Sequence, residues 1–316
     1  MKNIYKYIFG PVPSRRFGRS LGVDLTPFKT CSLDCIFCQL GATTCKTDRC
    51  REYVPADDVT AELKTWLESG EPADFITLAG SGEPTLHERF GEIIRFVRER
   101  TRIPVALLTN GTLLYRPEVR KQAANADVVK VTLTSWDRES FERIHRPCDG
   151  VTFERLVEGE RLFRDEFPGR LWLEVFLLEG INAEPGQVKR LAETARLIRP
   201  DCIHLNTCVR PAAEADAKPV SAAKLAGLAS LFTPAAEVIA EFRSEKPVDM
   251  QASEDAVFEM LRRRPCTAAQ IADVFGMHLN ELSKYLGDLV RSGRVRAVHR
   301  DSDIYYTGET EVRSRD

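Results

Sequence analysis

Residues 29–39 read Lys-Thr-Cys-Ser-Leu-Asp-Cys-Ile-Phe-Cys-Gln and place Cys31, Cys35 and Cys38 at intervals of four and three residues. A loop this short can bring three thiolates to three corners of one cubane iron–sulfur cluster. Such [4Fe–4S] clusters normally take four cysteine ligands. Three ligands would leave one iron open to a small molecule that must coordinate it and receive an electron. The segment therefore predicts a cluster with one open iron.

Six further cysteines leave other interpretations open. Structural zinc usually takes four Cys or His ligands, and Cys45 or Cys50 could complete such a set. These two thiols could instead ligate a second centre, form a redox pair or have no role. An auxiliary cluster generally needs three or four cysteines, and the remaining four are scattered: Cys148, Cys202, Cys208 and Cys266. We therefore expect no role for most of them.

The composition is that of an ordinary globular chain, with 43% hydrophobic and 29% charged residues among 316. This length favours two domains. The net charge of −2 gives no global attraction to nucleic acid or to an anionic membrane. No apolar run approaches the roughly 20 residues that span a bilayer, and the N-terminus shows no signal-peptide pattern. We expect a cytoplasmic protein without a membrane partner, where reducing conditions disfavour disulfides.

Strand-like and helix-like segments alternate from about residue 18 to residue 242. Strands are expected at Leu21–Leu25, Phe75–Ala79, Val105–Thr109, Val128–Thr134, Leu171–Leu178 and Cys202–Thr207. Helices are expected at Ala56–Glu68, Glu88–Glu99, Arg116–Ala124, Phe153–Glu166 and Gln187–Leu197. About six such units predict an α/β fold, a partial (β/α)6 TIM-like barrel over residues 1–244. The carboxyl ends of its strands would share one mouth, where such folds place their chemistry.

Small and polar residues follow several predicted strands at this mouth. The second strand runs into Gly80-Ser81-Gly82-Glu83, and glycines at a strand end let the backbone approach a ligand closely. Asn110 follows the third strand, the fourth carries Thr132 and Thr134, and the sixth carries Asn206. Each residue could equally serve in a turn or as a cap. Their occurrence together, in this order, favours a binding site.

The C-x3-C-x-aromatic-C loop just after the first predicted strand resembles that of the radical SAM superfamily. The resemblance implies that Cys31, Cys35 and Cys38 bind a [4Fe–4S] cluster whose open iron is chelated by S-adenosylmethionine (SAM). It also implies that the reduced cluster cleaves SAM to methionine and a 5′-deoxyadenosyl radical. Phe37 would pack near the cluster and the adenine. A reductant such as flavodoxin or ferredoxin would be a partner.

The same resemblance gives roles to the residues at the mouth. In the family the stretch at Ser81–Pro84 usually reads Gly-Gly-Glu-Pro and meets the SAM amino group, and here Ser81 replaces the first of those glycines. Thr132 matches a hydroxyl that approaches the SAM ribose or carboxylate. Thr134 stands where relatives often carry a carboxylate, and Asn206 would reach the adenosyl group.

Three further stretches are similar to one branch of the superfamily, the enzymes that build the tricyclic wybutosine base of tRNA. These stretches are Gly10–Arg16, Phe141–Pro147 and Asn206–Pro211. The resemblance covers roughly residues 8–245 and does not carry over a substrate. Four basic residues are candidates for anion or substrate contacts, although a role as salt-bridge partners at the rim fits them as well: Arg15, Arg16, His145 and Arg146.

The pattern changes beyond a polar linker at residues 245–252. Residues 253–307 predict a small winged helix-turn-helix domain, followed by a polar tail at 308–316. Its elements are expected at Glu254–Arg263, Thr267–Phe275, Leu279–Ser292, Arg294–Val298 and Ile304–Thr307. Helix Leu279–Ser292 would be the recognition helix for DNA or RNA. Eight basic residues balance eight acidic ones in this domain, whereas nucleic-acid surfaces are usually net basic. Protein docking or packing within the chain is therefore favoured over nucleic acid.

Three functions are consistent with these features. The favoured one is a radical SAM enzyme that modifies an unidentified protein, peptide or metabolite, with the winged helix as a docking platform. The first alternative is a radical SAM enzyme that modifies RNA or tRNA, with the winged helix binding the polynucleotide. The second alternative belongs to a different class: a regulator that senses redox state through the cluster and binds DNA.

Overall fold

The computed structural model describes residues 5–14, 16–239, 254–277, 279–300 and 303–309. The predicted linker at 245–252 and the candidate contact Arg15 lie outside the described residues, as does most of the predicted tail. None of the helices in the described ranges is both long and apolar enough to cross a bilayer.

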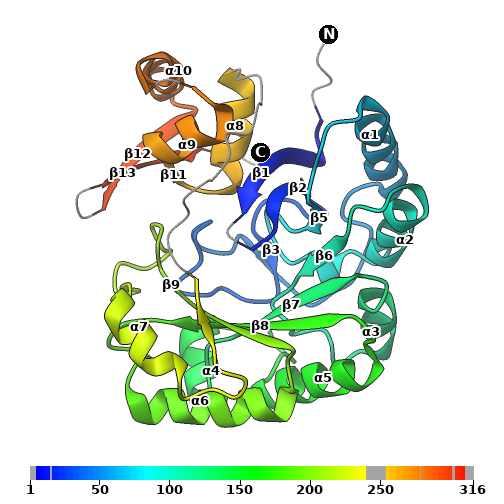
Figure 1. Ribbon diagram of the computed structural model, residues 1–316, viewed down its shortest axis with the longest axis vertical. Helices are drawn as coiled ribbons and strands as arrows, with labels where there is room; N and C mark the ends of the chain where they lie inside the picture. Colours follow the sequence, from blue (N-terminus) through cyan, green and yellow to red (C-terminus); the bar gives the residue numbers. More distant parts are fainter. Residues whose placement is uncertain (1–4, 15, 240–253, 278, 301–302, 310–316) are drawn as a thin grey trace.

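An eight-stranded sheet forms the body of the molecule, with its strands in the order β1-β2-β5-β6-β7-β8-β9-β10 (Figure 1). Its strands are β1 (Ile8–Ser14), β2 (Gly18–Val23), β5 (Phe75–Leu78), β6 (Val105–Leu108), β7 (Val128–Leu133), β8 (Arg170–Leu177), β9 (Cys202–Thr207) and β10 (Glu237–Val238). Only β1 and β2 pair antiparallel in this sheet. Six parallel strands, from β2 to β9, lie at or close to the predicted positions. The predicted α/β fold with a parallel sheet is confirmed.

Helices α1, α2, α3, α5 and α6 lie along the outer side of this sheet (Figure 1). The helices of this part are α1 (Ala56–Ser69), α2 (Phe90–Arg100), α3 (Pro117–Ala123), α4 (Arg138–His145), α5 (Phe153–Glu166), α6 (Pro185–Ile198) and α7 (Ala222–Ala229). Helix α4 was not predicted. Asp137 begins it with a capping box, in which its carboxylate accepts from the Ser140 backbone N–H.

Side chains alternate between the two faces of the parallel strands, because successive strand residues point to opposite sides. Val129 and Leu173 pack in the main core between sheet and helices. Their neighbours Lys130 and Glu174 lie on the other face, the interior of the barrel, where they form an ion pair. The sheet thus buries an apolar layer outside and holds polar groups inside.

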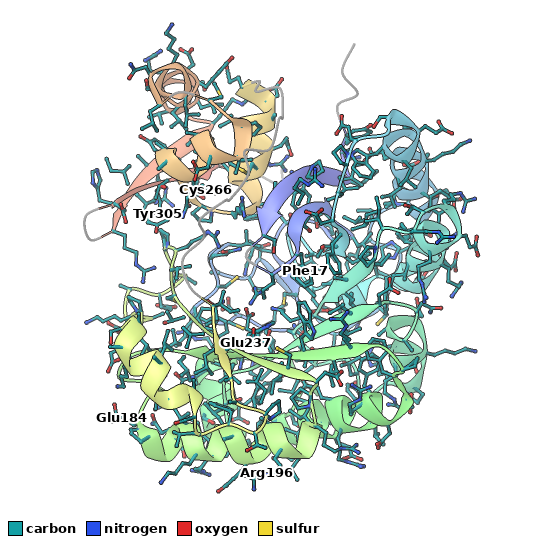
Figure 2. The ribbon with its side chains drawn as sticks, viewed as in Figure 1. Phe17, Glu184, Arg196, Glu237, Cys266 and Tyr305 are labelled. Carbon is teal, nitrogen blue, oxygen red and sulfur yellow. The ribbon has the colours of Figure 1, made fainter. Side chains whose placement is uncertain are left out.

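Aromatic rings fill one part of the barrel interior. Phe17, labelled near the centre of the view in Figure 2, stacks on Trp172 with ring centroids 5.1 Å apart. Phe75 meets Phe17 edge-on at 4.9 Å. These rings lie near the amino ends of the strands, because Phe75 begins β5 and Trp172 is the third residue of β8. The opposite end is therefore the candidate mouth.

A second group of elements follows residue 253 and has its own hydrophobic core. It comprises α8 (Glu254–Arg263), β11 (Cys266–Thr267), α9 (Ala268–Phe275), α10 (Leu279–Arg291), β12 (Val295–Arg300) and β13 (Asp303–Gly308). The three strands form an antiparallel sheet in the order β11-β13-β12. The three helices and two of these strands lie where the sequence predicts them.

These C-terminal elements pack against the barrel beside β1 (Figure 1). The buried guanidinium of Arg263, at the end of α8, lies 4.5 Å from the centre of the Phe9 ring and 3.7 Å from the Asp24 carboxylate. Tyr305 of β13, marked in Figure 2, donates its hydroxyl proton to the Val209 carbonyl at 2.8 Å. Both ends of this interface therefore touch loops that follow barrel strands.

Candidate active site at the barrel mouth

The cysteine loop, residues 29–39, follows β2 and is hydrogen-bonded on both sides. On one side, the Lys29 N–H donates to the Ser81 carbonyl at 2.6 Å, next to the turn after β5. On the other side, the Ile36 N–H donates to the Ile144 carbonyl at 3.0 Å, near the end of α4. The loop is therefore fixed across the carboxyl ends of the strands, where the barrel architecture predicts chemistry.

The three loop cysteines are free thiols, and each residue is partly exposed. Burial raises the pKa of Cys31 to about 12 and raises the pKa of Cys35 well above its ordinary value, and the neighbouring sulfurs add to both shifts. With pKa values raised in this way, the Cys31 and Cys35 thiols stay protonated unless a positively charged centre binds them. Metal ligation ionises such thiols and releases the protons.

The loop cysteines can be compared with the requirements of a single zinc ion. Within the described part of the chain, the one group of three metal-ligand side chains whose donor atoms all lie within 4.8 Å is Cys202, His204 and Glu237. The loop sulfurs are thus not all that close to one another. Tetrahedral zinc, with Zn–S near 2.3 Å, needs sulfurs only about 3.8 Å apart. The loop thiols therefore do not form a preassembled compact zinc site.

Cys45 and Cys50 do not complete a compact zinc site. Cys45 lies on the short strand β4 (Cys45–Lys46), which pairs with β3 (Thr30–Cys31), and its side chain is exposed. The Cys50 sulfur lies 3.7 Å from the Thr85 carbonyl and accepts from Arg116 at 3.4 Å. The open alternatives of a second centre or a redox pair gain no geometric support.

The glycines of the turn after β5 allow it to touch the cysteine loop. A Cβ on Gly82 would lie 2.0 Å from the Thr30 carbonyl oxygen, and one on Gly80 would lie 2.4 Å from Asp24 Cγ. Ser81 donates from both its N–H and its hydroxyl to the Asp24 carboxylate. This turn therefore supports the cysteine loop directly, a role that the sequence alone does not reveal.

We predict that Gly82→Ala displaces the cysteine loop, because the new methyl group meets backbone atoms that cannot move aside. We expect the free energy of unfolding to fall by about 1–3 kcal/mol. We also expect the variant to lose at least half of the iron that the wild type binds after anaerobic reconstitution. Gly186→Ala on α6 is the matched control, because a Cβ there meets nothing within 4 Å. Iron analysis and urea unfolding measure the two effects, and equal behaviour of the two variants would contradict the prediction.

Glu83 and Asn110 link this turn to the end of β6. The buried Glu83 carboxylate accepts from the Thr109 hydroxyl at 2.6 Å and from the Asn110 N–H at 2.8 Å. The Asn110 amide nitrogen lies 2.9 Å from Ser32 Oγ and 3.5 Å from Cys31 Sγ. Both predicted cofactor residues therefore lie beside the cysteine loop. Their contact with SAM stays a prediction.

The other predicted SAM contacts lie farther along the sheet. Thr132 of β7 is partly exposed and is paired in register with Glu174 of β8. Thr134 is fully buried, and its hydroxyl has no hydrogen-bond partner among the described residues. Asn206 of β9 donates to the Glu174 carboxylate at 3.0 Å. Thr132 and Asn206 thus share one neighbour on the inner face.

The candidate anion contacts occupy different surroundings. His145 does not lie at the rim, which corrects the rim interpretation for this residue. It is 2% exposed, and its Nδ1 lies 3.1 Å from Cys35 Sγ. Arg16 is bonded to Glu174 inside the barrel. Arg146 forms an exposed ion pair with Glu214 at 2.7 Å, the rim salt bridge that its alternative interpretation describes. These residues do not form one anion site.

Phe37 lies between the loop and the barrel interior. Its ring stacks on Phe176 of β8, with centroids 4.5 Å apart, and meets the His145 ring edge-on at 5.6 Å. This apolar contact covers the inner side of the cysteine loop. The arrangement agrees with the predicted shielding role of Phe37, whose contact with adenine stays a prediction.

A buried ionic cluster, not predicted from the sequence, lies in the barrel. Glu174 binds Lys130 at 2.5 Å and also pairs with Arg16, from the turn between β1 and β2. Burial opposes ionisation of Glu174, but the two cations outweigh it and hold the pKa of this carboxyl well below its usual range. The signal was visible, since each charge interrupts an apolar strand: Val-Val-Lys-Val in β7 and Leu-Trp-Leu-Glu-Val in β8.

A parallel barrel with three thiols on the loop after its first parallel strand defines a class of iron–sulfur proteins. The radical SAM superfamily model matches residues 25–192. The chain is 34% identical over 212 residues to a UPF0026 protein of Synechocystis, covering 67% of this chain and 78% of the relative. The chain belongs to the radical SAM superfamily, and UPF0026 proteins are its homologues.

Two further relatives and one solved structure are similar to this chain. A UPF0026 protein of Methanocaldococcus jannaschii is 28% identical and is covered over 97% of its length. A protein of Brachyspira hyodysenteriae named GTPase Obg is 35% identical over 92% of this chain, which spans only 43% of that relative. The crystal structure of a radical SAM methyltransferase from Sphaerobacter thermophilus shares the fold, with a TM-score of 0.51, 17% identity and coverage of 74% of this chain and 68% of that one.

Membership in this superfamily makes the chain an enzyme, and the superfamily uses a [4Fe–4S] cluster and SAM. The residues at the mouth fit the cluster. Three free thiols lie on one fixed loop, and their sulfurs are spaced more widely than a single zinc ion requires. An apolar wall formed by Phe37 and Phe176 lies beside them.

Proposed function

We propose that Cys31, Cys35 and Cys38 hold the cluster, and that the enzyme modifies an unidentified protein, peptide or metabolite. The observation that carries this proposal is the loop of three free thiols fixed across the barrel mouth. When bound, the cluster supplies an electron, and SAM supplies the sulfonium from which the 5′-deoxyadenosyl radical forms. A cytoplasmic flavodoxin or ferredoxin is the proposed reductant.

The protein's own residues position and shield the cofactors in this proposal. Gly80–Glu83 and Asn110 lie against the cysteine loop and would bind the amino acid part of SAM. Thr132, Thr134 and Asn206 would face its ribose and adenine. The Phe37–Phe176 stack would exclude water from the inner side of the site.

The inner face of the barrel favours a substrate with polar or charged groups. Arg16, Lys130 and Glu174 converge on it from the β1–β2 turn and from two strands. A buried ion pair seldom improves stability over a well-packed apolar core. Buried titratable groups with perturbed pKa values are instead typical of functional sites. We assign this cluster to substrate binding.

The C-terminal elements are proposed to be a winged helix that packs on the barrel and docks a protein partner. Most of its arginines already have acidic partners within these elements: Arg262, Arg263, Arg291, Arg294 and Arg296. These pairs leave little positive charge for phosphates, which supply most of the affinity for nucleic acid. RNA modification therefore stays the second candidate, supported by the likeness to the wybutosine branch.

Reductive cleavage of SAM tests the proposed function. We expect anaerobically reconstituted protein to release 5′-deoxyadenosine when dithionite and SAM are added, as measured by liquid chromatography with mass spectrometry. Protein without reductant and protein without iron are the controls. Background release from a fully loaded cluster would favour the redox-sensing regulator instead.

A further inference from the structure

Each of the three loop cysteines has one side-chain nitrogen within hydrogen-bond distance of its sulfur. Lys29 Nζ lies 3.1 Å from Cys38 Sγ, and His145 Nδ1 lies 3.1 Å from Cys35 Sγ. Asn110 Nδ2 lies 3.5 Å from Cys31 Sγ. The donors come from three separate places: the start of the loop, the end of α4 and the end of β6. One donor for each sulfur is an arrangement that no sequence motif requires.

Lys29, the donor to Cys38, has an unusual backbone conformation. Lys29 is only 3% exposed and has φ of +57°, in the left-handed region that side chains other than glycine seldom adopt. Its N–H donates to the Ser81 carbonyl, and its own carbonyl accepts from the Thr44 and Cys45 N–H groups. The surrounding loop thus fixes a buried ammonium group beside Cys38.

The other two donors are fixed by their own neighbours. Thr112 donates from its N–H and its hydroxyl to the Asn110 side-chain oxygen, at 3.0 and 2.7 Å. This contact turns the amide so that its nitrogen points toward Cys31. His145 is packed against the rings of Phe37 and Phe141. With its proton on Nδ1, His145 donates to Cys35.

Hydrogen bonds to cysteine sulfurs set the reduction potential of iron–sulfur clusters, together with net charge and burial. Reduction adds a negative charge, part of which resides on the sulfurs. Donors at these sulfurs stabilise that charge and raise the potential. Lys29 should contribute most, since it also brings a full positive charge into a region that excludes water.

We propose that Lys29, His145 and Asn110 form a hydrogen-bond shell that sets the reduction potential of the cluster, with Lys29 as its dominant member. These are positioning residues for electron transfer to the site. The inference rests on the proposed function, because it requires the loop cysteines to be the cluster ligands.

The test is an anaerobic redox titration of the reconstituted cluster, followed by electron paramagnetic resonance of the reduced form. We expect Lys29→Met to lower the ratio of reduced to oxidised cluster about tenfold at a fixed poise, equal to 59 mV for a one-electron couple. Lys29→Arg, which keeps a charged donor, should restore most of the difference. His145→Phe and Asn110→Leu should shift the titration in the same direction by less.

Lys46→Met is the matched control, because Lys46 lies on the neighbouring strand β4 and donates to the Arg146 carbonyl rather than to a sulfur. An equal shift in this variant would assign the effect to general charge and overturn the proposal. An unchanged titration of fully loaded Lys29→Met would also overturn it. Lys29→Gln keeps a neutral donor and provides the measurement if Lys29→Met does not hold iron, with an intermediate shift expected. Wild-type protein that forms no cluster would instead overturn the proposed function.

Discussion

Cys35→Ala is expected to abolish the broad visible absorbance of the cluster and to lower the rate of 5′-deoxyadenosine release at least about 100-fold. Loss of even an outer partner of a metal ligand typically costs 10–100-fold in affinity or activity, and a missing ligand should cost more. The sulfur of Cys35 is also central to the site, because burial and the neighbouring Cys31 and Cys38 sulfurs all act on it. Iron, sulfide and product analysis measure the effect.

Cys45→Ala provides the control for this experiment. Cys45 is a thiol of the same segment, but it is exposed and lies beside Thr30 on the β3–β4 pair. We expect this variant to load iron and to cleave SAM at the wild-type rate. If it loses its metal instead, while Cys35→Ala keeps its iron and sulfide, the ligand assignment made here is wrong.

The sequence predicts the six parallel strands from β2 to β9 because each of them contains several apolar residues. Strands β1 and β10 were missed for physical reasons. β1 carries Pro11 and Pro13 and pairs antiparallel at the edge of the sheet, whereas β10 has only two residues. Pairing with a neighbouring strand, rather than local propensity, forms both of them.

The candidate site likewise has one part that the sequence predicts and one part that it does not. The spacing of the three loop cysteines is a local property, and the superfamily assignment agrees with it. The contact between His145 and Cys35 joins residues 110 positions apart. It exists because α4 ends beside the loop, and helix α4 has only eight residues. No pattern in the sequence places that ring against a sulfur.

The C-terminal elements show what a charge count omits. A balance of basic and acidic residues does not say which of them meet. In the structure, Arg294 pairs with Glu254 and Asp255, across the interface between the start of α8 and the start of β12. The arginines of the C-terminal elements therefore act largely within the fold.

Two buried glutamates should respond in opposite ways to the same substitution. Glu174→Met removes the partner of Lys130 and Arg16 and leaves both cations in a region that excludes water. Removal of one member of a buried ion pair typically costs about 3–5 kcal/mol. Glu160→Met should be neutral or stabilising, because Glu160 is fully buried and its carboxyl oxygens have no hydrogen-bond partner among the described residues. Urea unfolding of cluster-free, reduced protein measures both.

The pH dependence of these differences follows from the two pKa directions. The cations hold the pKa of Glu174 low, so its contribution is complete above the unfolded value near 4.3 and disappears only as pH falls through the lower folded value. Burial raises the pKa of Glu160, so its presence costs more stability as pH rises above about 4.3. The free energy of unfolding of Glu160→Met should therefore rise relative to that of the wild type between pH 5 and pH 8. Equal losses in the two variants would mean that burial alone, and not the paired cations, decides what a glutamate does in this barrel.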